Sequence, residues 1–91
     1  MATAGIKYKI MPENLDINLD DIKAKAKEIV ESFKSGIFNE SEEQPIAFGL
    51  KALILTIALS EDENSDEVEN KLSEIDGVSS VELIDYRRAV G

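Results

Sequence analysis

The chain has 91 residues, a net charge of −9 at pH 7, and no Cys, His or Trp. The missing residue types exclude a disulfide framework, a thiol nucleophile, a thiolate zinc site and an imidazole general base, which argues against a conventional enzyme. The acidic balance argues against nucleic acid as a direct partner, because phosphate binding needs a basic surface.

The first predicted element is a strand over residues 4–11. Apolar Ile6, Tyr8 and Ile10 alternate with lysines, which is the period of a strand with one buried face. Pro12 ends this strand, since proline cannot donate a hydrogen bond to a sheet ladder.

An amphipathic helix over residues 19–34 follows, and then a weak strand. Apolar residues recur on one face of the helix, Asn18 is its candidate N-cap, and Ser35-Gly36 is its predicted end. We assign residues 39–47 to a weak edge strand, because they are mostly polar and include a proline that a central strand would not tolerate.

The second half of the chain predicts a strand, a helix and a strand. Residues 50–59 follow a turn at Gly49 and have apolar side chains on both faces, which is the strongest strand signal of the chain. Residues 65–76 predict a second amphipathic helix. Residues 78–86 predict the last strand, and residues 87–91 a short tail.

The order β-α-β-β-α-β predicts an α+β fold, a ferredoxin-like two-layer sandwich with a four-stranded antiparallel sheet and two helices on one face. The length fits one domain, so residues 1–91 are predicted to form a single ferredoxin-like domain. The other face of the sheet would be open. It would carry Lys7, Lys9, Ala52, Ile54, Thr56 and Ala58.

Most of the negative charge lies in residues 60–76, which hold eight acidic side chains and one Lys. Such a run is usually a solvated helix face, and the alternative is a surface that meets a basic partner. The spacing Asp62-x-Asn64-x-Asp66 matches the first three ligands of a calcium loop, but the required Gly and the terminal Glu are absent. We therefore expect no metal and no cofactor.

The sequence shows no membrane or export segment. Its longest apolar run, Leu53–Leu59, is interrupted by Thr56 and is far shorter than a membrane span. The N-terminus lacks the basic and apolar regions of a signal peptide. We therefore expect a cytoplasmic protein that has no membrane partner and is monomeric when free.

Two features remain as candidate contacts. Phe48 precedes a Gly between two predicted strands, and it either folds back into the core or projects as an anchor for a partner. Arg87 and Arg88, the only arginines of the chain, lie in the predicted tail, where they are either solvated or reach a partner. The residues alone leave both alternatives open.

Three segments together resemble the elongation factor 1-beta family in its short archaeal-type form. Residues 42–53, EEQPIAFGLKAL, look like the signature of that family. Residues 77–88, GVSSVELIDYRR, resemble its C-terminal strand and tail, and residues 7–12, KYKIMP, resemble its opening strand. The resemblance covers essentially the whole chain in the right order.

The resemblance implies a guanine-nucleotide exchange factor for elongation factor 1-alpha, the GTPase that delivers aminoacyl-tRNA to the ribosome. It implies that Phe48, with its neighbours Gly49 and Lys51, binds this GTPase. In the eukaryotic relatives a penultimate Lys of the C-terminal tail disturbs the magnesium site, and the matching position here is Arg88, next to Arg87. Arg departs from that pattern, because a planar guanidinium and an ammonium are not interchangeable.

An exchange factor makes and breaks no bond, so the resemblance implies a protein with no covalent chemistry of its own. A cation or a displaced backbone beside the magnesium ion would weaken magnesium and GDP binding together. The alternative function is a small-molecule-sensing or self-associating regulatory module of the ferredoxin-like type. Its dimer interface would be the open sheet face around Ile54.

Overall fold

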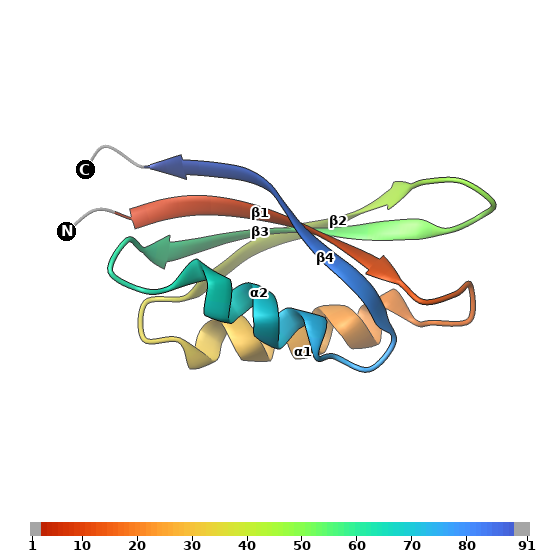
Figure 1. The fold of residues 1–91 in the computed structure, drawn as a ribbon, viewed down its shortest axis with the longest axis horizontal. Helices are drawn as coiled ribbons and strands as arrows, with labels where there is room; N and C mark the ends of the chain where they lie inside the picture. Colours follow the sequence, from red (N-terminus) through yellow and green to blue (C-terminus); the bar gives the residue numbers. More distant parts are fainter. Residues whose placement is uncertain (1–2, 89–91) are drawn as a thin grey trace.

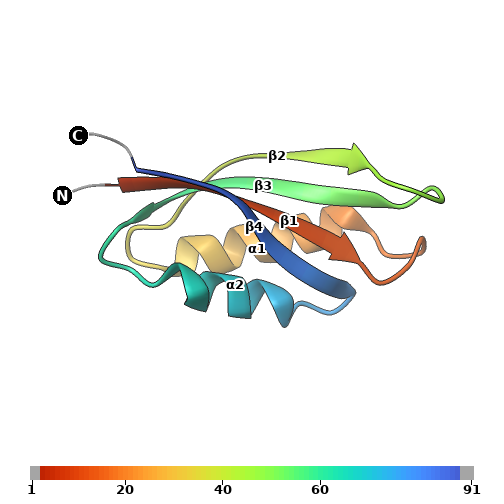
Figure 2. The ribbon, with the colours of Figure 1, turned by 45° about the horizontal axis from the view of Figure 1, so that its top comes forward.

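The computed structural model of the protein describes residues 3–88, and its elements follow the predicted order. The elements are β1 (Thr3–Pro12), α1 (Leu19–Ser32), β2 (Ile37–Pro45), β3 (Lys51–Ser60), α2 (Ser65–Ser73) and β4 (Val78–Arg88). The strands form one antiparallel sheet in the order β2-β3-β1-β4 (Figure 1). Both helices cover the same face of the sheet, as Figure 2 shows. The predicted ferredoxin-like two-layer sandwich is therefore confirmed.

The edge strand β2 begins and ends two residues earlier than the predicted range of residues 39–47. Its first residue, Ile37, pairs with Ala58, and Pro45 forms the last pair with β3. The apolar pattern misses this range because β2 lies at the sheet edge, where Phe38 is the apolar side chain that packs against the core. Pairing with β3, and not an alternation of its own residues, defines this strand.

Both helices are shorter than predicted. Helix α1 ends at Ser32, and α2 ends at Ser73. Phe33 leaves α1 with extended φ and ψ angles of −79° and 141°. The chain then passes so close to the helix end that a Cβ atom on Gly36 would overlap the carbonyl oxygen of Val30. The tight return of the chain over the helix end therefore sets the boundary of α1.

We expect Gly36→Ala to destabilise the protein by about 2 kcal/mol. The added methyl group would meet the backbone of α1 and not the end of a flexible side chain, so the helix end or β2 must shift. Denaturant unfolding followed by circular dichroism measures this free energy. Gly5→Ala is the matched control, because a Cβ atom there would have its nearest neighbour, the carbonyl oxygen of Arg87, at 3.9 Å. Equal stability of the two variants would contradict the prediction.

Tyr8 is the largest fully buried side chain and joins β1 to α2. Its hydroxyl donates a hydrogen bond of 2.9 Å to the carbonyl oxygen of Ser65, at the start of α2. Burial raises the pKa of Tyr8 to about 12, and the carboxylates of Glu69 and Asp66 add to the effect. The fold therefore holds this phenol in its neutral form.

The raised pKa of Tyr8 makes stability depend on pH. Because the ordinary pKa is 10.0, Tyr8 contributes stability that is present below about pH 10 and is lost as the pH rises toward 12. The full loss is roughly 2 to 3 kcal/mol. Tyr8→Phe should lower the free energy of unfolding by about 1 kcal/mol at pH 7, because the hydrogen bond is lost. This difference should shrink and then reverse between pH 10 and 12 in unfolding curves, and a constant difference would contradict the prediction.

The sheet face opposite the helices is less open than predicted. Ala52 and Ile54 on this face are buried, with 0% and 4% of their surface exposed. Gln44 lies opposite Ala52, and Lys9 and Glu42 lie on either side of Ile54. The aliphatic parts of such long side chains cover smaller neighbours. Ile54 therefore offers little apolar surface to a second copy of the chain.

Candidate partner-binding site

The connection between β2 and β3 is a tight hairpin tip formed by residues 46–50. Two backbone hydrogen bonds of 2.8 and 3.1 Å close it. The two central residues, Phe48 and Gly49, have positive φ angles of 59° and 80°. Positive φ at both central positions is typical of a type I′ turn, whose twist matches that of a β-hairpin. The local fold therefore demands a left-handed backbone at Phe48.

Phe48 occupies this tip at a cost in stability. Its side chain is 93% exposed, so it contributes little hydrophobic burial to folding. A left-handed backbone costs a residue other than Gly about 1 to 2 kcal/mol. The alternative in which Phe48 folds back into the core is therefore wrong. A rigid and exposed aromatic side chain is what an anchor for a partner protein requires.

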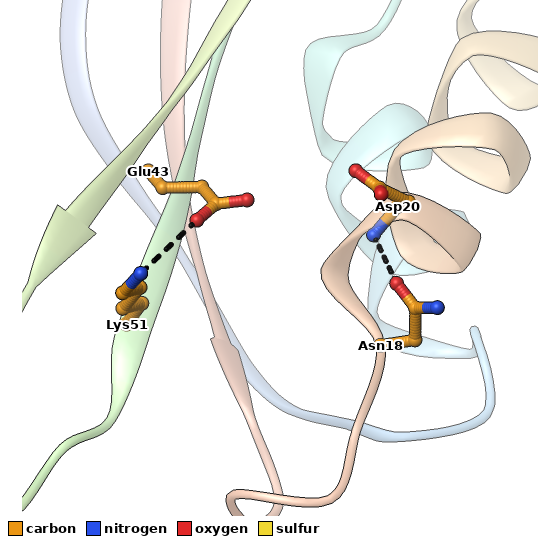
Figure 3. A network of polar contacts seen from close by, with 4 residues as sticks. All are labelled: Asn18, Asp20, Glu43 and Lys51. Carbon is orange, nitrogen blue, oxygen red and sulfur yellow. Dashed lines mark hydrogen bonds and ion pairs between the residues drawn. The ribbon is translucent and has the colours of Figure 1, made fainter.

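Lys51 lies at the base of the hairpin tip, as the first residue of β3. Its Nζ atom is 3.7 Å from a carboxylate oxygen of Glu43 across the hairpin, and both side chains are about half exposed (Figure 3). An exposed ion pair of this kind contributes little to stability. The ammonium group therefore remains accessible to a partner.

The loop between β1 and α1, residues 13–18, lies next to the hairpin tip. It ends at the predicted N-cap, where Asn18 Oδ1 accepts a hydrogen bond of 2.8 Å from the Asp20 amide (Figure 3). Leu15 in this loop is 64% exposed. Periodicity in the sequence does not mark Leu15, because two apolar residues, Leu15 and Ile17, are too few in a short polar connection to define one.

The two arginines are part of β4, so the prediction of a tail over residues 87–91 is wrong for its first two residues. Residues 89–91 lie outside the described part of the chain. The strand continues because Arg87 and Arg88 pair with residues at the start of β1. Consecutive residues of a strand point to opposite faces, so the two guanidinium groups lie on opposite sides of the sheet.

Each arginine contacts one carboxylate. Arg87 Nε donates a hydrogen bond of 3.0 Å to Asp85, two residues earlier in β4. Arg88 Nε lies 2.5 Å from Oε1 of Glu61, in the turn after β3. This Glu61 oxygen is buried, and the guanidinium group is its neighbouring cation. Arg88 therefore lies near the end of β4, on the face of the sheet that the helices cover, and 75% of its side chain is exposed.

The structure gathers the predicted contact residues into two groups at opposite ends of the sheet (Figure 1). Phe48 and Gly49 lie at the hairpin tip, and Lys51 lies at its base, as the first residue of β3. Arg88 lies level with Leu59, near the other end of β3. At about 3.3 Å per residue, the strand separates the two groups by about 30 Å. The structure therefore does not bring them together.

The acidic residues 60–76 form the turn after β3 and helix α2. Glu63 accepts hydrogen bonds of 2.7 and 2.6 Å from the amide and hydroxyl of Ser35. Asn64 caps α2 by accepting a bond of 2.9 Å from the Asp66 amide. Two residues of the calcium-like spacing, Asn64 and Asp66, therefore form the N-terminal cap of α2. Within the described residues, no cluster of three ligating side chains could hold a metal ion, and no helix is long and apolar enough to cross a membrane.

Comparison with known proteins gives the family. Residues 5–88 match the family described as the EF-1 guanine nucleotide exchange domain. The chain belongs to this family. A relative from Methanosarcina barkeri named Elongation factor 1-beta is 36% identical over 89 residues, which cover 97% of this chain and 99% of the relative. A relative of the same name from Methanocaldococcus jannaschii is 42% identical, covering 98% and 100%. The resemblance seen in the sequence is thereby confirmed.

The fold of this exchange domain also occurs outside its family. The crystal structure of the ACT domain from the GTP pyrophosphokinase of Chlorobium tepidum is similar with a TM-score of 0.61. The match covers 88% of this chain and 96% of that domain, at 18% sequence identity. This likeness shows the fold alone, so it does not support the regulatory alternative.

Proposed function

We propose that this chain is a guanine-nucleotide exchange factor that promotes GDP release from the translational GTPase elongation factor 1-alpha. The match to the exchange-domain family over residues 5–88 carries this proposal. The exposure of Phe48 on a strained and rigid tip supports it, because that position suits a protein partner better than it suits folding. The protein acts in this scheme without direct contacts to nucleic acid or membrane.

The two groups of contact residues bind different parts of the GTPase. They lie about 30 Å apart along β3, which is too far for one nucleotide site to touch both. We assign the end of β4, which carries Arg88 on one face and Arg87 on the other, to the neighbourhood of the magnesium ion, because the resemblance matches Arg88 to the cation that disturbs this site. Phe48, together with Gly49 and Lys51, then docks on a separate apolar pocket of the same GTPase.

GDP release follows from competition at the magnesium site. The ion bridges the phosphates and neutralises them. A guanidinium group brought beside it repels the ion and hydrogen-bonds to oxygens that the ion would hold. Binding of the exchange factor and binding of the nucleotide must then weaken each other by the same factor. Contacts at the Phe48 end supply binding free energy that offsets the cost of displacing magnesium.

The function requires no covalent chemistry from this chain. Its residues bind, position a cation and weaken another protein's metal site, so neither a general base nor a nucleophile is involved. Both groups of contact residues come from one chain, and we propose that the protein acts as a monomer.

Release of a fluorescent GDP analogue from elongation factor 1-alpha tests the proposal. Catalytic amounts of the protein should accelerate release in the presence of excess unlabelled GDP. A release rate that the protein leaves unchanged would contradict the proposal. The regulatory alternative predicts a dimer, which sedimentation at several protein concentrations would detect. It also predicts that a small ligand raises the melting temperature, which thermal unfolding would detect.

A further inference from the structure

A second exposed apolar side chain lies against Gly49, the residue that follows Phe48. Leu15, in the loop between β1 and α1, is 64% exposed. Its Cδ2 atom lies 3.5 Å from the position that a Cβ atom on Gly49 would take, so the loop and the hairpin tip are in contact. Ile46, in the same hairpin connection, is 40% exposed. Three apolar side chains from two loops therefore gather at one end of the molecule, where Figures 1 and 2 both show these loops.

Hydrogen bonds hold Leu15 in place at the top of a turn. The Asp16 amide donates a bond of 2.9 Å to Asn14 Oδ1. The Ile17 amide donates a bond of 3.4 Å to the Asn14 carbonyl oxygen, which closes the turn. The Glu13 amide donates a bond of 2.8 Å to the carbonyl oxygen of Gly77, which ties the loop to the segment before β4. Leu15 is thus presented on a structured turn, as Phe48 is.

A hollow of about 240 Å³ lies between the two loops. It is lined by Pro12, Asn14, Leu15, Gly49, Leu50 and Lys51. Large exposed apolar side chains that gather on one surface mark interaction sites more often than they serve folding. Leu15 keeps most of its apolar area in water, so this area is free to be buried by a partner.

We propose that Leu15 is a second anchor, which enters the same apolar pocket of the GTPase as Phe48. This inference rests on the proposed function, because the partner is the one that Phe48 binds. The two side chains belong to touching loops, so a surface that buries one reaches the other. The exposed acidic residues Glu13 and Asp16 flank Leu15. The pocket should therefore carry basic side chains at its rim.

Exchange kinetics test this proposal. The KM for the complex of GDP with elongation factor 1-alpha and the kcat of exchange are measured for the wild type, Leu15→Ala, Phe48→Ala and the double variant. Leu15→Ala should raise KM about 5- to 20-fold. The kcat should stay within about twofold of the wild type, because the Arg88 end is intact. The fold-increase in KM of the double variant should be smaller than the product of the fold-increases of the two single variants, because the two anchors share a pocket.

Ile84→Ala is the matched control. Ile84 is 45% exposed and lies within β4, where it lines a different hollow from that of Leu15 and Gly49, so this variant should keep the wild-type KM. Leu15→Ala should melt like the wild type, since the side chain is mostly exposed. If Leu15→Ala behaves as Ile84→Ala does while Phe48→Ala loses activity, the second anchor is overturned and the proposed function stands. If the KM increases of the two single variants multiply fully in the double variant, the shared pocket is overturned. A wild type without exchange activity would overturn both proposals.

Discussion

Phe48→Ala should reduce kcat/KM for nucleotide exchange about 30- to 100-fold. Truncation of a central aromatic anchor costs about 2 kcal/mol or more, and 1.4 kcal/mol is a factor of about ten. The melting temperature should not fall, because the side chain is 93% exposed and makes little contact within the protein. Release of fluorescent GDP at a series of partner concentrations measures the loss, which should appear mainly in KM.

Phe48→Gly provides the sharper control. Gly adopts the φ angle of 59° without strain, so this variant should be more stable than the wild type by about 1 kcal/mol. It should nevertheless lose exchange activity to the same extent as Phe48→Ala. A glycine variant with both higher stability and full activity would show that the aromatic ring is no anchor.

Arg88→Ala should lower the kcat of exchange about 10- to 100-fold while KM changes little. Hydrogen bonds to charged groups contribute roughly 1.5 to 3 kcal/mol, and the hairpin tip of the variant still docks. The defect should shrink when the magnesium concentration is lowered, because less of the ion then remains to be displaced. Release rates at several magnesium concentrations measure this, and a defect that magnesium does not change would contradict the assignment.

Three further variants separate charge, position and stability. Arg88→Lys keeps a cation and should retain part of the activity. Arg88→Ala leaves the buried Glu61 oxygen without its cation, which should lower the free energy of unfolding by about 1 kcal/mol. The double variant Arg88→Ala with Glu61→Gln should recover this loss of stability. Arg87→Ala should cause a smaller loss, since Arg87 lies on the opposite face of β4. A larger loss from Arg87→Ala would assign the magnesium contact to that residue instead.

Local patterns in the sequence predicted much of the fold. The alternation around Tyr8 and the apolar run before Leu59 identified β1 and β3, because both strands bury their side chains. Asn18 predicted the start of α1, since a cap acts within its own turn. The bounds of β2 and the end of α1 could not be read in this way. They depend on pairing with β3 and on the close passage of Gly36 over the helix end.

The candidate site also combines features that the sequence shows with features that only the tertiary structure shows. The sequence by itself determined that this chain has no His and no Cys and that Phe48 and the arginine pair are its candidate contacts. Only the tertiary structure decided that Phe48 is exposed, that Leu15 lies against the neighbouring Gly49, and that Arg88 lies at the far end of the sheet against Glu61. Periodicity, caps and turns act over a few residues, so a sequence shows them directly. Contacts between distant residues depend on strand register and on the packing of whole elements, which arise only when the chain folds.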